Sequence, residues 1–287
     1  MLEKSGFSDV VCRELNIETP EPDLKDWEEM VERIRSRSEE VHIGLVGKYV
    51  KLHDAYLSVA EAMNHAGYEQ NTFVKIHWID SETITRETAA DILKNLDGII
   101  IPGGFGNRGI EGMILSAKYA RENKIPYFGI CLGMQIAVIE FARNVLGLED
   151  AHSGEFDEQC AHKVIDFMPG QSEEIDKGGT LRLGSYPCSI KAGTKMEACY
   201  GTELIHERHR HRYEFNNQYR RELVEAGLVI SGTSPDDRLV ETIELPDHPF
   251  FVGVQFHPEF KSRPNQPHPL FKGFISASLK QAKGKKE

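Results

Sequence analysis

The chain has 287 residues, 40% of them hydrophobic and 28% charged, which is enough for one large domain or for a domain with an extension. Its formal net charge of −11 disfavours binding to nucleic acid or to an anionic membrane, because both favour a basic surface. No apolar run approaches the roughly 20 residues that span a bilayer, and the N-terminus lacks a secretory signal, so we expect a cytoplasmic protein. The five cysteines form no C-x-x-C pair, which argues against a zinc site, and their odd number argues against a disulfide framework.

Residues 1–39 differ from the rest of the chain. Two short helical patterns flank an acidic, proline-containing stretch at residues 18–23. In the second pattern Trp27, Met30, Val31 and Ile34 recur at the spacing of an amphipathic helix. We interpret residues 1–39 as an interdomain linker or docking arm and residues 40–287 as the main domain.

From Val41 onward, short apolar runs alternate with helical patterns, which predicts an α/β fold with a mostly parallel central sheet flanked by helices. After Glu155 the pattern becomes β-rich. We expect strands at 41–46, 73–79, 98–101 and 127–130, and later near 180–190, 203–215, 228–232, 240–245 and 250–256. We expect helices at 55–65, 88–95, up to 123, from 132 onward and at 270–282, followed by a frayed tail at 283–287.

The stretch at residues 127–135 has the layout of a nucleophile elbow with cysteine in the central position. An apolar strand leads into Gly129, Cys131 and Gly133, and a helix follows. A tight strand-to-helix turn leaves no room for side chains at the two glycines and exposes Cys131 in a strained backbone. The helix N-terminus favours the thiolate, and its free amide groups can bind a developing oxyanion.

A thiolate nucleophile needs a general base, and His257 is the strongest candidate among the twelve histidines. A strong strand signal at 251–256 runs directly into His257, Pro258 and Glu259. The carboxyl ends of parallel strands gather at one edge of a sheet, so His257 can meet Cys131 there. Pro258 favours an extended chain, in which Glu259 would point to the same side as His257 and orient it.

The glycine-rich segment at residues 102–109 matches G-x-G-x-x-G after a strand, which would ordinarily suggest a dinucleotide site. That fingerprint expects an acidic residue at the end of the next strand, where this chain has Cys131. We therefore expect the segment to supply a backbone N–H that completes an oxyanion hole with the amide of Leu132. Lys48 does not belong to a P-loop, because the required glycine spacing is absent.

The basic run at residues 208–212 alternates arginine and histidine, so a strand would separate the two residue types onto opposite faces. Two histidines on one face with no third ligand make a poor zinc site. The run is either a solvated basic edge or the source of an arginine that binds a substrate carboxylate in bidentate fashion.

Together, the motifs at 102–104, 129–135 and 256–259 resemble the class I (triad) glutamine amidotransferases over about residues 41–279. The resemblance implies a flavodoxin-like fold of that family. Within it, further segments resemble the CTP synthase family: 46–49, 103–109, 137–144, 178–184 and 207–214.

This resemblance implies glutamine hydrolysis through a cysteine thioester, with Cys131 as nucleophile, His257 as general base and acid, and Glu259 as its orienter. It implies an oxyanion hole from the backbone of Gly104 and Leu132. The expected glutamine-binding residues are Gly104, Gln135, Glu155 and Arg212, and Arg182 matches a position linked to activation by GTP.

The resemblance also implies a partner, the CTP synthase amidoligase domain that binds ATP, magnesium and UTP and that this chain lacks. We expect no cofactor or metal in the chain itself, and ammonia as its product. Two alternatives stay open: a glutaminase of another synthetase or a γ-glutamyl hydrolase, and a regulatory or stress-response module with the same fold.

Overall fold

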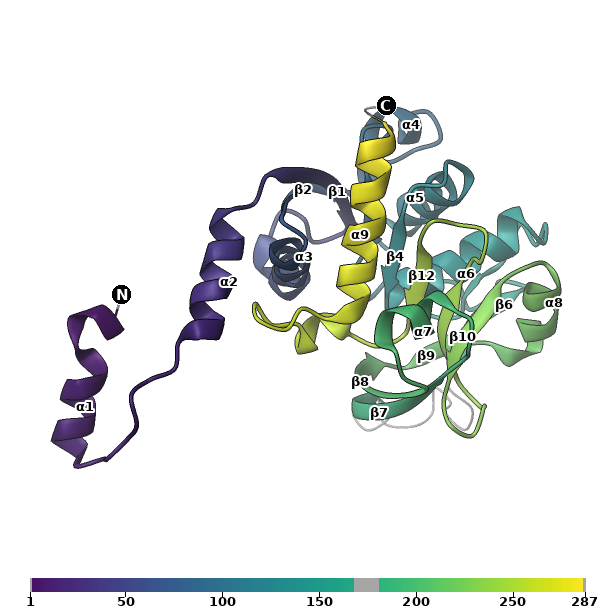
Figure 1. Cartoon of the computed structure of the whole chain (residues 1–287). Helices are drawn as coiled ribbons and strands as arrows, with labels where there is room; N and C mark the ends of the chain where they lie inside the picture. Colours follow the sequence, from purple (N-terminus) through teal and green to yellow (C-terminus); the bar gives the residue numbers. More distant parts are fainter. Residues whose placement is uncertain (1, 168–180, 286–287) are drawn as a thin grey trace.

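The computed structural model describes residues 2–167 and 181–285 and places a nine-stranded sheet between two layers of helices (Figure 1). The strand order is β2-β1-β3-β4-β12-β11-β10-β7-β8. A second sheet has the order β5-β6-β9. The predicted α/β fold with flanking helices is confirmed.

The first five strands of the large sheet are parallel and follow the flavodoxin-like order. Strands β3, β4 and β12 are buried along their whole length, as expected for strands covered on both faces, whereas the edge strand β2 is largely half-buried or exposed. Their carboxyl ends share one edge, from which the loops carrying Gly104, Cys131 and His257 emerge. The strands are β2 (Thr72–Asp80), β1 (Glu39–Gly47), β3 (Gly98–Ile101), β4 (Tyr127–Ile130) and β12 (Phe251–Val254).

The remaining four strands continue the same sheet in antiparallel fashion, so the sheet is mixed and the β-rich half is not separate. They are β11 (Val240–Glu244), β10 (Val229–Thr233), β7 (Arg182–Ile190) and β8 (Leu204–His211). The small sheet contains β5 (His152–Ser153), β6 (Lys163–Phe167) and β9 (Tyr213–Phe215). The prediction of a single strand at 203–215 is wrong. The chain leaves the large sheet and enters the small one at Arg212, so this segment forms two strands. Of the motif at 178–184, residues 178–180 lie outside the described residues.

Each face of the large sheet packs against helices through its own apolar core. One core lies under α4 (Ala89–Leu93), α5 (Ile110–Glu122) and α6 (Leu132–Asn144). The other lies under α3 (Leu57–Glu69), α7 (Lys195–Tyr200) and α9 (Pro269–Gly284). A short helix α8 (Arg220–Glu225) precedes β10. Short 3-10 turns occupy Glu3–Ser5, His53–Tyr56, Ser81–Thr83, Asn217–Tyr219 and Pro258–Lys261.

The N-terminal segment forms an arm that projects from the body of the molecule (Figure 1). Helix α1 (Phe7–Leu15) has no buried residue, although its apolar side chains line one side. Helix α2 (Lys25–Arg35) buries Met30, and Arg37 stacks over the rings of Tyr68 and Phe73. These contacts hold the base of the arm, while the division at residue 39 stays a prediction.

Two helix ends differ from the sequence-based expectation. Helix α3 passes Gly67 and ends at Glu69, because Gly67 packs against the backbone of Thr72 and does not terminate the helix. Helix α9 continues to Gly284, and Nζ of Lys285 bonds to Asp97 Oδ1 at 3.0 Å, so the tail up to Lys285 is held by these contacts. In the described ranges, no helix combines the length and apolar character needed to cross a bilayer.

The contact between α5 and the turn at Ser81–Thr83 can be tested with a matched pair of glycines. A Cβ at Gly112 would collide with the backbone carbonyl of Ser81, whereas a Cβ at Gly284 would meet nothing within 4 Å. We expect Gly112→Ala to lower the free energy of unfolding by about 1 to 3 kcal/mol. Gly284→Ala should leave it unchanged or slightly higher. Urea unfolding measures both, and equal values for the two variants would contradict the packing described here.

Candidate active site

Cys131 lies at the turn between β4 and α6 with a strained backbone, φ 51° and ψ −100°. Its N–H donates to Val254 O at 2.7 Å, which ties the turn to β12. A Cβ at Gly129 would come within 2.5 Å of the carbonyl carbon of Gly133, and a Cβ at Gly133 would collide with Ile101 O. The expectation that this turn excludes side chains at both glycines is therefore confirmed. The nucleophile candidate is held at a helix N-terminus by close backbone packing.

His257 follows β12 and lies beside Cys131, as the shared sheet edge predicted. Its Nδ1 is 2.8 Å from Glu259 Oε1, and its backbone N–H donates to Arg208 O at 2.7 Å. Since Nδ1 faces a carboxylate, Nε2 is the nitrogen left to exchange a proton with the sulfur. The local chain is not extended as expected: Glu259 reaches His257 from a 3-10 turn that begins at Pro258.

Burial lowers the pKa of His257, but the charge and hydrogen bond of Cys131 and those of Glu259 outweigh it and raise the pKa to about 10. A negative charge on the Cys131 sulfur, together with Glu259, therefore favours the imidazolium form of His257. Such a thiolate–imidazolium pair with an orienting carboxylate is suited to acyl transfer.

Gly104 and Leu132 lie together, since a Cβ at Gly104 would be 3.3 Å from Leu132 Cδ2. Lys48, which is buried, holds the loop that carries Gly104: its Nζ donates to Phe105 O at 3.0 Å and also to Gly106 O. Burial lowers the pKa of Lys48 to about 8, partly offset by the charge of Glu155. In the sequence, Lys48 belongs to the segment 46–49 that resembles the CTP synthase family and fails the P-loop spacing, but neither observation predicted this role in the site.

A narrow pocket of about 50 Å³ opens beside Cys131 and contains the four residues expected to bind glutamine. Gly104 and Gln135 line it together with Glu155 and Arg212. Glu155 Oε1 accepts a hydrogen bond from the N–H of Gly106 at 3.0 Å, and burial raises the pKa of Glu155. The pocket thus presents an acid and an arginine to the same small space. Its other lining residues were not predicted: Phe105, His211 and Tyr213.

Gln255 is a second residue that sequence reasoning missed. Its side chain is fully buried, and its Nε2 is 3.6 Å from Cys131 Sγ. Gln255 is the single amide in the otherwise apolar run at 251–256. Since a buried amide must find hydrogen-bond partners, its position there could have indicated a polar contact in the site.

Arg182 is not in the pocket. It is buried, with Nη2 2.7 Å from Glu241 Oε1 and Nη1 3.5 Å from Glu214 Oε1. Burial lowers the pKa of Arg182, but Glu241 and Glu214 outweigh this and raise it. The alternation predicted for the basic run holds along β8, where Arg208 and Arg210 are exposed while the intervening histidines are buried.

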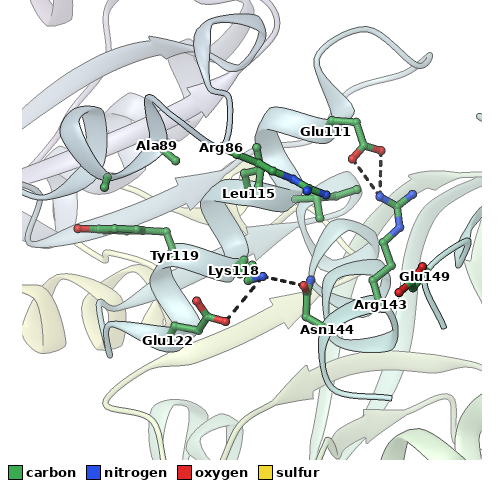
Figure 2. A pocket seen from close by; sticks show the side chains of 12 residues that line it. Arg86, Ala89, Glu111, Leu115, Lys118, Tyr119, Glu122, Arg143, Asn144 and Glu149 are labelled. Atoms are coloured by element: carbon green, nitrogen blue, oxygen red, sulfur yellow. Dashed lines mark hydrogen bonds and ion pairs between the residues drawn. The ribbon is translucent and has the colours of Figure 1, made fainter. Parts of the chain in front are cut away.

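Of two further hollows, one adjoins Cys131 and the other does not. One adjoins Cys131 from the His257 side and is lined by Tyr49, Phe105, Arg210 and Phe260. The other is a wider groove over α5 and α6, remote from Cys131, in which charged side chains pair with one another (Figure 2). There, Arg143 holds Glu111 at 3.0 Å, and Lys118 contacts Asn144 at 2.9 Å.

Comparison with known proteins agrees with this geometry. The model of the glutamine amidotransferase class-I family matches residues 51–277. A CTP synthase of Listeria innocua is 59% identical over 97% of this chain and 52% of its own length. One of Carboxydothermus hydrogenoformans is 62% identical over 98% of this chain and 53% of its own length. The chain therefore spans about half the length of the curated relatives it matches.

A solved glutaminase domain of Trypanosoma brucei CTPS with bound acivicin is similar in fold, with a TM-score of 0.80 and 40% identity. The match covers 84% of this chain and 94% of that one. A putative GMP synthase protein of Thermoplasma acidophilum shares the fold at 17% identity, with a TM-score of 0.55 over 87% of this chain and all of that one.

The role of Glu259 leads to a prediction about pH. Glu259→Gln removes a charge that raises the pKa of His257, so we expect the midpoint of His257, followed by NMR, to fall by about one unit or more. A raised histidine pKa stabilises the fold fully below about pH 6.5, and this stabilisation is lost as the pH rises to about 10. The stability difference between wild type and variant should therefore be largest near pH 6 and shrink toward pH 10.

Glu61→Gln is the matched control, since it makes the same change in the i,i+4 pair with His65, where the carboxylate is half exposed. It should leave the His257 midpoint unchanged. A stability difference for Glu259→Gln that stays constant between pH 6 and pH 10 would contradict the assignment.

Proposed function

Because the chain belongs to the class I glutamine amidotransferases and is similar to the glutaminase half of CTP synthases, we propose that it hydrolyses L-glutamine to glutamate and ammonia at Cys131. The observation that carries the proposal is the convergence of Cys131, His257 and Glu259 beside a pocket with an acid and an arginine. A glutaminase that uses a cysteine nucleophile requires this combination of an activated sulfur and an amino-acid site.

In the proposed complex, Arg212 binds the α-carboxylate of glutamine and Glu155 binds its α-ammonium group. Gly104 and Gln135 contact the side-chain amide. The pocket is small, and we expect glutamine binding to rearrange it. Exchange of the hydrogen bond between Glu155 and Gly106 for one between Glu155 and the substrate ammonium group supplies such a change.

The first chemical step forms a thioester and releases ammonia. The Cys131 thiolate attacks the carboxamide carbon, and the backbone N–H groups of Gly104 and Leu132 stabilise the oxyanion. The carbon–nitrogen bond then breaks as the His257 imidazolium transfers its Nε2 proton to the departing nitrogen. The products are ammonia, neutral His257 and a γ-glutamyl thioester on Cys131.

The second step returns the enzyme to its starting state. Neutral His257 removes a proton from water, whose oxygen attacks the thioester carbon. The carbon–sulfur bond breaks to give glutamate with a protonated γ-carboxyl group, the Cys131 thiolate and the His257 imidazolium, and the γ-carboxyl group then releases its proton to water. Glu259 keeps the ring oriented in both steps. These steps use side chains, backbone amides and water, so the proposal includes no cofactor or metal in this chain.

We propose that the ammonia is used by a CTP synthase amidoligase domain, which would convert UTP to CTP with ATP and magnesium. Support comes from the second hollow beside Cys131, which opens past His257 between the exposed rings of Tyr49, Phe105 and Phe260. Exposed aromatic rings around an opening suit a protein interface. The cytoplasm is the proposed location, because five unpaired cysteines fit a reducing compartment.

GTP is a proposed effector that acts on Arg182 indirectly. Arg182 is paired with Glu214, and Glu214 follows Tyr213, which lines the glutamine pocket. A ligand that disturbs this buried pairing would therefore displace the wall of the pocket. We expect Arg182→Met to weaken any response of the glutaminase rate to added GTP, and an unchanged response would exclude this route.

Cys131→Ala is the direct test of the mechanism. We expect it to abolish ammonia release from glutamine, because Cys131 carries the sulfur that forms the thioester. A glutamine-like electrophile should add to Cys131 in wild type, as mass spectrometry of the labelled peptide would show. Cys160→Ala, which changes a partly exposed cysteine that lines neither hollow beside Cys131, should retain both properties. Continued ammonia release by Cys131→Ala would exclude the mechanism.

Reconstitution tests the partner and separates the alternatives. The chain is mixed with an amidoligase domain from a similar CTP synthase, UTP, ATP and magnesium, and CTP is measured. We expect glutamine to support CTP formation with wild type, and ammonium chloride alone to support it with Cys131→Ala. Ammonia from glutamine without CTP, while ammonium chloride still yields CTP, would favour a different synthetase or a free glutaminase. A folded chain that releases no ammonia in any mixture would favour a regulatory module.

A further inference from the structure

Gln255 directly follows β12, two residues before His257, and points its side chain at the nucleophile. Its backbone N–H donates to Glu241 O at 2.8 Å, which fixes the residue to β11. Its Nε2 lies 3.6 Å from Cys131 Sγ, within the range of a hydrogen bond to sulfur. The residue is fully buried, so water does not compete for this contact.

A chain of hydrogen bonds determines which end of the Gln255 amide faces the sulfur. The carbonyl of Tyr213 can only accept, and Gln135 Nε2 donates to it at 3.1 Å. The same Nε2 donates to Gln255 Oε1 at 3.3 Å. Rotating the Gln255 amide by 180° would place two NH₂ groups against each other. The NH₂ group of Gln255 must therefore face Cys131 Sγ.

We propose that Gln255 is a further catalytic residue of the proposed glutaminase, one that donates a hydrogen bond to the Cys131 sulfur and holds it as a thiolate. An amide NH₂ can only donate, and a thiolate is a much better acceptor than a neutral thiol. Gln255 thus adds a neutral donor to the positive charge of His257. The sulfur is held between two donors that approach from different residues.

The same bond changes strength during the reaction. It weakens when the sulfur forms the thioester and loses its charge, and it strengthens again when the carbon–sulfur bond breaks. Gln255 therefore assists departure of the thiolate in the hydrolytic step. Gln135 lines the glutamine pocket and also holds Gln255. A substrate that contacts Gln135 therefore also affects the hydrogen bond from Gln255 to the Cys131 sulfur.

The test is the pH dependence of Cys131 alkylation by iodoacetamide, followed by mass spectrometry of the Cys131 peptide in the whole chain. We expect Gln255→Met, which keeps the length and removes the donor, to raise the pH of half-maximal reaction by about one unit, a tenfold loss of thiolate. Gln135→Met should raise it by a smaller amount, because it frees the Gln255 amide to rotate. The other four cysteines serve as internal controls.

Thr242→Val is the matched control, since it removes a buried hydrogen bond on neighbouring β11, between Thr242 Oγ1 and Ser231 Oγ at 2.9 Å, without touching the sulfur. Its alkylation profile should equal that of wild type. An unmoved midpoint in folded Gln255→Met overturns the proposal, and if that variant does not fold, an unmoved midpoint in Gln135→Met does so. Alkylation needs no glutamine, so the result stands apart from success or failure of the glutaminase assay.

Discussion

The close backbone packing around Cys131 is the constraint on which the site depends. Gly129 packs against Gly133, Gly133 packs against Ile101 O, and Cys131 between the two glycines has a positive φ. The strain places one sulfur at the end of α6, next to the loops that follow β3 and β12. Because β3, β4 and β12 are adjacent parallel strands, the loop that carries Gly104, the turn at Cys131 and His257 meet without any long connection. The stability of the sheet thus supplies the strain energy of the site.

Oppositely charged groups lie next to one another around this turn. Glu259 and the thiolate favour the His257 imidazolium, while Lys48 holds the glycine loop and faces Glu155. Each of these groups is at least partly buried, so solvent screens the interactions between them only weakly. The site is therefore a coupled unit of charged groups. Kinetic effects of substitutions here should not be additive.

The sequence predicted those parts of the site that depend on local geometry and on one topological rule. Cys131 was identified from its glycines, and His257 from the shared edge of parallel strands. Gln255 and Lys48 were missed because their partners come from distant segments, which no local pattern specifies. Arg182 was matched to a motif, yet its buried pairing with Glu241 depends on the antiparallel half of the sheet. The break at Arg212 was missed for a related reason: alternation describes a strand but does not reveal that the chain changes sheets.

That break has a mechanical consequence. Arg212 is the only residue between β8 of the large sheet and β9 of the small one, and Glu155 lies just beyond β5 of the small sheet. A molecule that contacts both side chains together with Cys131 would bridge the two sheets and restrict their relative movement. Occupancy of the pocket would then reduce the mobility of β9 and β6, which lie well away from the reacting atoms. Ligand binding at this pocket would then change the dynamics of the small sheet as well as allow reaction at Cys131.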